Sequence, residues 1–205
     1  MTPPRRRIAK STISHQRVLD AAARLFRERG YTGTTLRAIA AEVHLEAGSI
    51  YYHFKSKDDL IEAVLYRAMD EVIRNVREAV DAVPAAAPAR ARIAAAVRAH
   101  VSTIVTIGDY TLATRRVFGQ VPEPMRARLM RQRDSYGRFW QDLLEAAQAE
   151  GALRLGADMH LARLFILGGL NWTVEWFKPE RQPLSEVVEE FTRFVVDGLA
   201  APCVE

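Results

Sequence analysis

Apolar residues recur along most of the chain at the spacing of an α-helix, and this periodicity constrains the fold more than any other feature. Val18, Ala21, Ala22, Leu25 and Phe26 show it first, at i, i+3, i+4, i+7 and i+8, which forms one stripe on a helix. Sustained alternation of apolar and polar residues and an Asn-Gly hairpin turn, the signals of strands, do not occur in the sequence. The pattern predicts an all-α protein of about nine helices, with three short helices first and longer helices after them.

Interruptions of the periodicity place the ends of these helices. Gly30 follows a basic last turn and should stop the first helix, Thr34 or Thr35 is placed to cap the second, and Ser56 should cap the fourth. After the first helix, which carries the stripe of residues 18–26, the expected spans are about 36–43, 49–54, 57–80, 89–107, 110–118, 124–149, 159–177 and 185–199.

Composition argues against membrane and secreted classes of protein. The longest apolar stretch, residues 161–177, is interrupted by Arg163, Asn171 and Glu175 and is shorter than the ~20 apolar residues of a membrane span. The basic N-terminus is not followed by the apolar segment of a secretory signal. Cys203 is the single cysteine, so no internal disulfide can form. We therefore expect a cytoplasmic protein that does not associate with a membrane.

Positive charge is concentrated in the N-terminal part of the chain. Up to Lys57 there are eleven basic and four acidic residues, a net charge of +7, whereas the remaining residues carry a net charge of −3. A small basic segment on a mildly acidic body indicates a polyanionic partner for that segment alone, although basic tails that bind nothing are also common.

The second and third predicted helices are short and are joined by about four residues, which is the form of a helix-turn-helix. Ile50 and Phe54 are four residues apart, so they share a face that we expect to be core. Gly48 allows close approach of the backbone, and Ser49, Tyr52 and His53 lie off the apolar face. Hydroxyl and imidazole donors of this kind bind phosphate oxygens. The segment therefore predicts a surface that binds DNA.

The stretch "RLFRERGYTGTTLRAIAAEVHLEAGSIYYHFKSKDDLIEAVL" resembles the N-terminal domain of the tetracycline-repressor (TetR) family. The resemblance covers about residues 15–65, a quarter of the chain. It implies a homodimer that binds a short palindromic operator, with C-terminal helices that form a small-molecule pocket and the dimer interface. The residues that would contact DNA are Thr35, Gly48, Tyr51, Tyr52, His53 and Lys57, largely through phosphates, with Arg37 and Ser49 as candidates for base edges.

One departure from the family pattern concerns the turn before the third helix. Many relatives carry Ser or Thr and then Lys before the glycine, whereas this chain has Glu46 and Ala47. The operator sequence therefore cannot be transferred from the family. A flexible basic arm, residues 1–14, could compensate by lying in the minor groove or on the backbone, and a solubilising tail is the alternative. We expect a DNA-binding domain over residues 15–60 and a ligand-binding and dimerisation domain over 61–205.

Functional signals in the C-terminal part are weaker. Pockets in helical proteins form between helices and are mostly apolar, with few polar anchors. The candidate lining residues are Tyr110, Thr114, Phe118, Tyr136, Phe139, Trp140, Phe165 and Trp172. The family's usual dimer elements are its last two helices, and the candidate interface residues are Trp176, Phe191, Phe194 and Val195. For Trp172, plain helix core or dimer interface is the alternative to lining a ligand cavity, and for Trp176 the alternative to the interface is plain helix core.

The segment "LGGLNWTVEWFKP" loosely resembles regulators of lipid or sterol breakdown that sense acyl-CoA thioesters. We therefore expect a largely hydrophobic effector, such as an acyl-CoA-type thioester. Arg115 and Arg116, or the basic run 126–133, could neutralise an anionic group, although a solvated helix face also explains that run. A cationic or aromatic drug-like effector, with a role in efflux control, is the alternative.

Two other classes of function, an enzyme and a helical adaptor, fit the sequence less well than a regulator. The sequence lacks a Gly-x-Ser-x-Gly elbow, a phosphate-binding Gly-x-x-x-x-Gly-Lys loop and a His-Glu-x-x-His motif, and its five histidines lack metal-ligand spacing. We predict no enzyme activity, no catalytic residue, no metal site and no cofactor. A helical adaptor has no use for phosphate donors on a short helix. The preferred prediction is a ligand-responsive transcriptional repressor, and repression in particular comes from the family resemblance.

Overall fold

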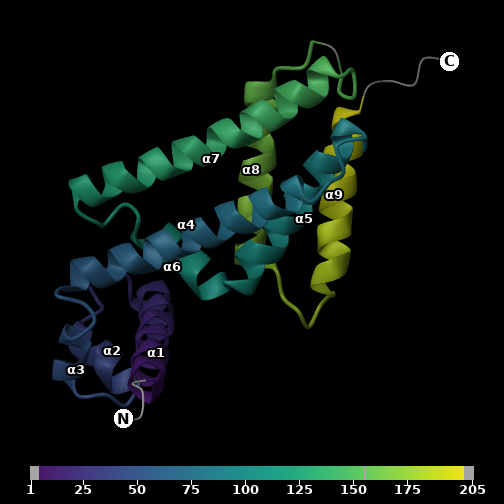
Figure 1. Cartoon of the computed structure of the whole chain (residues 1–205). Helices are drawn as coiled ribbons and strands as arrows, with labels where there is room; N and C mark the ends of the chain where they lie inside the picture. Colours follow the sequence, from purple (N-terminus) through teal and green to yellow (C-terminus); the bar gives the residue numbers. More distant parts are fainter. Residues whose placement is uncertain (1–4, 155, 201–205) are drawn as a thin grey trace. The chain divides into compact units, whose positions relative to one another are not determined.

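The computed structural model describes residues 5–154 and 156–200, without the side chains of residues 5–14 and Ala47. These residues form nine helices (Figure 1). Their β-structure is limited to one isolated bridge, between Leu153 and Ala200. The predicted all-α class is therefore confirmed. Residues 1–4 of the expected basic arm and Cys203 lie outside the described residues.

The observed helices follow the predicted order, and most of their ends lie within one residue of the predicted ones. Three differences are larger: the first helix extends back to Arg5, the third ends at Tyr51 rather than near Phe54, and the sixth begins at Gly108. The bounds are α1 Arg5–Arg29, α2 Leu36–Glu42, α3 Ala47–Tyr51, α4 Lys57–Asp81, α5 Ala89–Thr106, α6 Gly108–Val117, α7 Glu123–Ala149, α8 Met159–Trp176 and α9 Leu184–Leu199.

The chain divides into two compact units. The first contains the residues up to Ala68 together with Asp109–Leu129, and the second contains Met69–Gly108 and the residues from Met130 onward. Helix α4 contributes its first half to one unit and its second half to the other. We expected a single boundary after residue 60, whereas packing groups nearly all of α6 with α1, α2 and α3.

Local signals in the first unit explain where its helices begin and end. Gly30 has φ +72° and donates its backbone N–H to Phe26 O at 2.9 Å, which closes α1 with the residue best suited to positive φ. Thr35 is the N-cap of α2, because its hydroxyl oxygen accepts from the backbone N–H of Ala38 at 3.1 Å. Thr34 is buried instead, and its hydroxyl donates to Gly30 O at 2.8 Å.

The turn between α2 and α3 has a Schellman geometry built without glycine. The backbone N–H of Leu45 donates to Ala40 O at 2.9 Å, and that of His44 donates to Ala41 O at 3.1 Å. His44 has φ +55°, a region in which residues other than glycine are strained. This turn fixes the angle at which α3 leaves α2, and Ile50 then anchors α3, because its side chain is fully buried.

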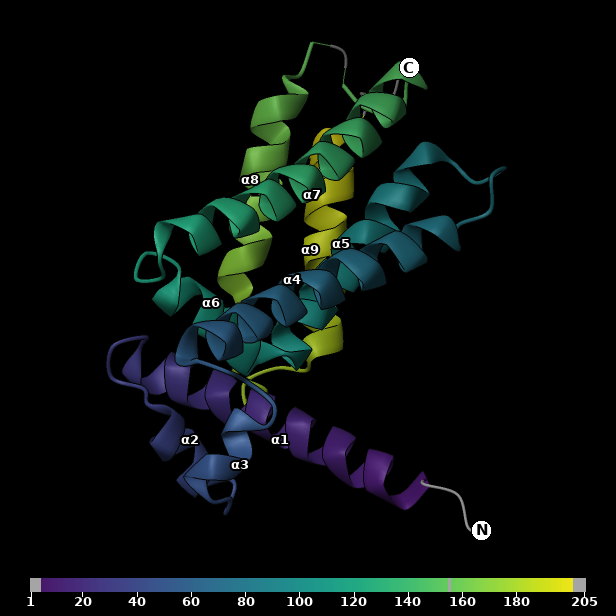
Figure 2. The same cartoon turned by 60° about the vertical axis from the view of Figure 1, so that its left-hand side comes forward.

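The second unit is built around α5, which packs against both α8 and α9 (Figure 2). Its buried cluster includes Ile93, Val97 and Ile104 of α5, together with Trp140 and Leu144 of α7. Asp158 caps α8 by accepting from the backbone N–H groups of its first turn. The buried face of α8 lies towards this core, so its opposite face is available to solvent.

Candidate nucleic-acid interface and effector-binding unit

The predicted DNA-contact residues of α3 lie on its outer face. Tyr52 is 81% exposed and Tyr51 59% exposed, and Gly48 and Ser49 are exposed in the first turn. Ile50 is fully buried, as its spacing predicted. The structure therefore presents two phenolic hydroxyls and a serine hydroxyl together on α3 and its C-cap residue, Tyr52, and groups of this kind bind phosphate oxygens.

Helix α2 adds two exposed side chains near its start. Thr35 is exposed and, although its oxygen accepts the capping hydrogen bond, its hydroxyl proton can still be donated outwards. Arg37 is exposed in the first turn of the same helix. The N-terminal turn of a helix favours anions, which adds to the attraction of a phosphate for these donors.

Lys57, the remaining predicted cation of this surface, is partly engaged within the protein. Its Nζ donates to Tyr31 O at 3.0 Å and lies 4.1 Å from the centroid of the Tyr31 ring. The Tyr31 hydroxyl donates to the Asp58 carboxylate. Burial, and next this hydrogen bond, raise the pKa of Tyr31 to about 12. Lys57 therefore positions the turn after α1 as well as carrying charge, a contact that no local sequence signal indicates.

His53 lies half-buried beside Tyr52, in a cluster of rings that extends to α1. Its ring meets that of Tyr52 edge-on at 5.2 Å and that of His15 at 5.6 Å. His15 in turn stacks on Phe54 at 4.9 Å. Burial, and next the charge of His53, lower the pKa of His15. No sequence signal singles out His15, because thirty-eight positions separate it from His53.

Helix α6 is tied to α1 by side-chain hydrogen bonds. The Tyr110 hydroxyl donates to Asp20 Oδ1 at 2.6 Å, and Gln16 Nε2 donates to the same oxygen at 2.6 Å. Arg27 pairs with Asp109 at the start of α6. Burial and the Asp20 carboxylate raise the pKa of Tyr110. Tyr110 is thus buried among residues of the first unit, where it holds α6 against α1.

The core of the second unit contains a buried polar network centred on His100 of α5. Its Nδ1 lies 2.8 Å from the Tyr136 hydroxyl, and its Nε2 lies 3.3 Å from Asn171 Oδ1. Because an amide oxygen only accepts, Nε2 carries the proton and Nδ1 accepts from Tyr136. Burial lowers the pKa of His100 to about 4 and raises that of Tyr136. The imidazole is therefore neutral, with both nitrogens satisfied.

Parallel stacking extends this network towards α4. The rings of His100 and Tyr136 are 5.9 Å apart at an interplanar angle of 8°, and those of Tyr136 and Phe139 are 6.2 Å apart at 9°. The Arg77 guanidinium of α4 lies 4.7 Å from the centroid of the Phe139 ring. Polar and aromatic groups of four helices, α4, α5, α7 and α8, thus meet in this network, and they could act as polar anchors for a ligand.

The eight predicted lining residues fall into three groups. Tyr110, Thr114 and Phe118 belong to the first unit. Tyr136, Phe139 and Trp140 belong to the core of the second unit, where Trp140 is fully buried. Phe165 and Trp172 are exposed on α8, by 85% and 53%. Neither unit contains all eight of these residues. That they line one ligand pocket therefore stays a prediction.

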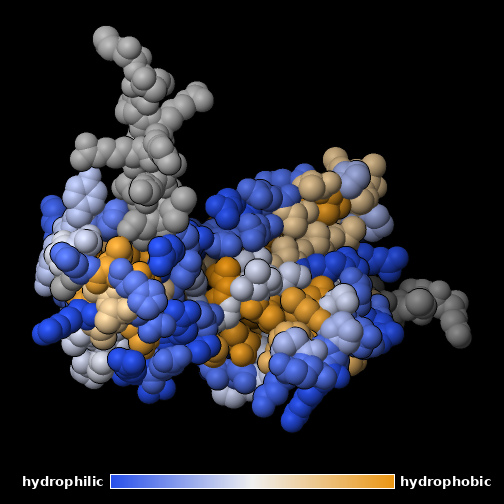
Figure 3. All heavy atoms as spheres, turned by 90° about the horizontal axis from the view of Figure 1, so that it is seen from below, coloured by the Kyte–Doolittle hydropathy of each residue, from blue (hydrophilic) through white to orange (hydrophobic). Residues whose placement is uncertain are grey.

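The four predicted interface residues lie near one another on α8 and α9. The rings of Trp176 and Phe191 meet edge-on with centroids 5.9 Å apart, Val195 is half-buried, and Phe194 is 66% exposed. Leu161 and Leu164 of α8 are also exposed. Figure 3 shows apolar residues at the surface among polar ones in one view of the molecule. Exposed apolar patches of this kind mark interaction sites.

His100 is a functional candidate that no motif in the sequence singles out. A signal for it exists, because it lies three residues after Val97 and four before Ile104, on the buried face of α5. Asn171 had no such signal. Its role depends on the contact with His100, seventy-one positions away.

Over the described ranges, no group of three or more His, Cys, Asp or Glu side chains could hold a metal ion. None of the helices in the same ranges is both long and apolar enough to cross a lipid bilayer.

Two family models match the chain. The model for the tetracyclin repressor-like C-terminal domain matches residues 86–199, more than half of the chain, and the model for bacterial regulatory proteins of the tetR family matches residues 18–64. The HTH-type transcriptional repressor KstR2 of Rhodococcus jostii strain RHA1 is 29% identical over 187 residues, which cover 90% of each protein.

Solved structures of regulators share the fold of this chain. The ketosteroid transcriptional regulator KstR2 of Mycobacterium tuberculosis has a TM-score of 0.82 at 24% identity, over 91% of this chain and 95% of that one. AibR, solved in complex with isovaleryl coenzyme A and operator DNA, has a TM-score of 0.76 at 25% identity, over 89% of this chain and 97% of that one. The chain therefore belongs to the tetracycline-repressor (TetR) family and is a DNA-binding transcriptional regulator rather than an enzyme.

Proposed function

We propose that this protein is a homodimeric repressor that binds a palindromic operator through α2 and α3 and is released by a hydrophobic acyl-CoA-type effector. The observation that carries the DNA-binding part is the exposure of Tyr51 and Tyr52 beside Ser49 on α3, while Ile50 anchors the same helix in the core. A regulator of this family acts on DNA, so we also place the protein in the cytoplasm.

In this proposal the contacts with DNA divide into two kinds. Tyr51, Tyr52, His53, Lys57 and the start of α2 at Thr35 contact phosphates, and these contacts position the protein without reading sequence. Arg37 and Ser49 reach base edges, since an arginine can pair bidentately with guanine. Glu46 is exposed immediately before α3, and its carboxylate would repel phosphates near the start of that helix.

Variants of the exposed face test this assignment. Tyr52→Phe removes one hydroxyl and should weaken binding to all DNA sequences alike, by about 1 kcal/mol. Lys57→Ala should reduce the slope of log affinity against log salt by about one, with Lys55→Ala as the matched exposed control. Binding is measured by fluorescence anisotropy on duplexes from beside the gene. If the double variant with Tyr52→Phe and Lys57→Ala binds DNA as tightly as the wild type, this face does not contact DNA.

The effector class is supported by the relatives rather than by the fold. AibR was solved with isovaleryl coenzyme A, and the second unit of this chain offers a neutral buried polar network next to an aromatic stack. An acyl chain suits apolar surroundings, and a thioester carbonyl would be oriented if the Tyr136 hydroxyl or the His100 Nε2–H exchanged its present partner for the carbonyl oxygen. A cationic drug-like compound, the alternative effector, would instead be bound by carboxylates, whereas His100 contacts a hydroxyl and an amide oxygen, those of Tyr136 and Asn171.

Release of the operator would follow from a change in α4. This helix contributes to both compact units without interruption from Lys57 to Asp81. An effector can shift the protein towards a form that does not bind DNA only by binding that form more tightly, typically by ~1–3 kcal/mol of coupling. A panel of acyl-CoA thioesters of increasing chain length, titrated into the protein–operator complex, tests this. If no member of the panel lowers operator affinity, the acyl-CoA part of the proposal fails.

The proposed self-association face consists of α8 and α9, with Trp176, Phe191, Phe194 and Val195 at its centre. Isologous contacts in a C2 dimer use the same patch on both copies. The exposed aromatic residues of α8 and α9 provide such a patch. Sedimentation equilibrium of the purified protein tests the dimer directly, and a monomer at micromolar concentration would contradict it.

A further inference from the structure

Tyr31 follows the glycine that ends α1, and three of its polar groups are bound by side chains from elsewhere in the first unit. Its carbonyl oxygen accepts from Lys57 Nζ at 3.0 Å, and its hydroxyl donates to the Asp58 carboxylate. Its backbone N–H donates to Gln120 Oε1 at 3.1 Å. Lys57 and Asp58 begin α4, whereas Gln120 follows the end of α6, eighty-nine positions further along the chain than Tyr31. The turn after α1 therefore connects the start of α4 with the segment after α6.

Gln120 is held through both atoms of its side-chain amide. Its Oε1 accepts from Tyr31, and its Nε2 donates to the backbone oxygen of Arg116 in α6 at 2.9 Å. A Cβ added at Gly30 would lie only 3.2 Å from Gln120 Oε1, closer than an ordinary van der Waals contact. Glycine at position 30 thus leaves room for Gln120, in addition to supplying the positive φ that ends α1.

Tyr31 restrains the ammonium group of Lys57. Besides the hydrogen bond to the carbonyl oxygen, Nζ lies 4.1 Å from the centroid of the Tyr31 ring. An ammonium group has three donors, so two remain for a phosphate. A mobile lysine side chain loses rotamer entropy when it binds a phosphate, whereas a side chain that is already restrained loses less. Restraint of Lys57 in the free protein should therefore tighten its binding to the phosphate backbone.

We propose that Gln120 is a positioning residue for DNA binding, which holds Tyr31 where Tyr31 orients Lys57 towards phosphates. This inference rests on the proposed contact between Lys57 and DNA. It deepens that proposal, because it identifies a side chain outside the DNA-binding surface that sets the strength of the contact. Residues 15–65, which carry the family resemblance, do not include Gln120.

A role in stability alone is the competing explanation for these contacts. Gln120 is exposed, so water competes for its amide and the hydrogen bond adds little to the free energy of folding. Loss of this side chain should therefore weaken DNA binding without unfolding the first unit. The two explanations differ in whether the effect of Gln120 on affinity depends on Lys57.

A double-mutant cycle on Gln120 and Lys57 tests this dependence. Gln120→Met keeps the length of the side chain but removes the acceptor for the Tyr31 N–H. We expect it to weaken DNA binding about 4-fold when Lys57 is present, because the ammonium group is then less restrained. In a Lys57→Ala background it should weaken binding by less than about 1.5-fold, since no ammonium group is left to position.

The same cycle is measured on the operator and on an unrelated duplex. Both should show the same loss, because phosphate contacts carry no sequence information. Affinities are obtained by fluorescence anisotropy at one salt concentration. Circular dichroism and urea unfolding of each variant confirm that the helices are intact.

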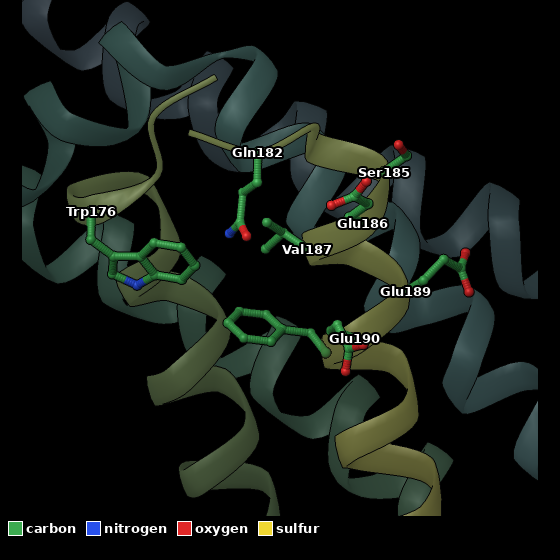
Figure 4. A pocket seen from close by; sticks show the side chains of 8 residues that line it. Trp176, Gln182, Ser185, Glu186, Val187, Glu189 and Glu190 are labelled. Atoms are coloured by element: carbon green, nitrogen blue, oxygen red, sulfur yellow. The ribbon is translucent and has the colours of Figure 1, made fainter. Parts of the chain in front are cut away.

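Two other glutamines provide matched controls. Gln16 Nε2 donates to Asp20 and lies 3.3 Å from the Tyr110 hydroxyl, so Gln16→Met loosens α1 from the first turn of α6. Its effect on affinity should be the same with and without Lys57→Ala. Gln182 is exposed in the loop between α8 and α9, where it lines a pocket of the second unit (Figure 4). Gln182→Met should bind DNA like the wild type, as a control for exchanging an exposed glutamine for methionine.

The results distinguish a failure of this inference from a failure of the proposed function. If Lys57→Ala binds DNA as tightly as the wild type, Lys57 does not contact phosphates, and both proposals for this residue are wrong. If Lys57→Ala weakens binding but Gln120→Met acts equally in both backgrounds, or has no effect, only the inference is overturned. It is also overturned if Gln16→Met depends on Lys57 as strongly as Gln120→Met does, because general loosening of α6 would then explain both.

Discussion

The two units place polar and apolar groups in opposite ways. The N-terminal helices expose tyrosine hydroxyls at Tyr51 and Tyr52 and bury apolar Ile50 beneath them. The second unit buries a histidine and a tyrosine, His100 and Tyr136, and exposes Phe165 on α8. Exposed aromatic residues therefore do not indicate one kind of partner. Hydroxyl-bearing rings among cations suit a phosphate backbone, whereas bare rings suit an apolar surface such as a second copy of the chain.

The largest expected effect comes from the buried polar group of the second unit. Burial holds the pKa of His100 at about 4, below the ordinary 6.5, so the unfolded chain binds more protons between these pH values. The stabilising effect of the neutral imidazole is complete above pH 6.5 and is lost as pH falls towards 4, by about 3 kcal/mol. His100→Gln removes this titration, so its unfolding free energy should depend less on pH over that window.

Urea unfolding at a series of pH values and one protein concentration measures this difference. The control is His160→Gln, which removes an exposed histidine of the same unit and should keep the wild-type pH dependence. If the unfolding free energies of His100→Gln and the wild type depend equally on pH, His100 is not the buried neutral group that the structure shows. The contrast with the exposed polar groups of the N-terminal helices would then disappear.

The exposed apolar face of the second unit should give the next largest effect. Phe194 is 66% exposed on α9, so Phe194→Asp changes little in the monomer but places a charge in the proposed interface. We expect self-association to weaken about 100-fold, or about 2.7 kcal/mol. Operator affinity should fall with it, since both DNA-binding surfaces of a dimer are needed for a palindrome.

Tyr52→Asp is the comparison for that variant. It also places an aspartate where an exposed aromatic residue stood, but on the DNA-binding surface. It should abolish operator binding through repulsion of phosphates and leave the dimer dissociation constant unchanged. Sedimentation equilibrium and fluorescence anisotropy on both variants measure the two quantities. If each variant affected both quantities equally, the division of partners between the two units would not hold.

A smaller and more selective effect is expected at Arg37 on α2. If its guanidinium pairs with a guanine, Arg37→Ala should cost about 2 kcal/mol on the operator and relax the preference at one base pair. Affinity for unrelated duplexes should fall much less, by the contribution of one charge. Affinities across a set of single-base operator variants measure this. A uniform loss across all the duplexes would place Arg37 on the phosphate backbone instead.

Helix positions were predictable because their signals are local. Gly30 and Thr35 lie within a residue of the helix end or start that they specify, and Ile50 and Phe54 share a face by spacing alone. The choice between Thr34 and Thr35 as cap could not be made from sequence, because either can cap. It depends on the burial of Thr34 against Gly30 O.

Long-range features were not predictable in this way. The grouping of α6 with α1 depends on Tyr110 and Asp20, ninety positions apart. Periodicity identified the stripe of Phe165 and Trp172 but could not say whether it faces a core, a cavity or solvent, since an apolar stripe has the same spacing in all three cases. The exposure of Phe165 supplied that information, and the assignment of this stripe to self-association is our proposal.

The smallest expected effect lies at the turn between α2 and α3. His44 has φ +55°, where an L-residue is strained by roughly 1 kcal/mol and glycine is not. His44→Gly removes this strain but also gives the unfolded chain more freedom, so we expect a net gain of about 0.5 kcal/mol in unfolding free energy. Chemical denaturation measures it, with His44→Ala as the control that keeps the strain. The backbone hydrogen bonds of Leu45 and His44 close the turn in either variant, and the side chain of His44 is exposed. Operator affinity should therefore stay within about twofold of the wild type. A His44→Gly variant that is more stable but binds the operator much more weakly would instead show that the imidazole itself contacts DNA.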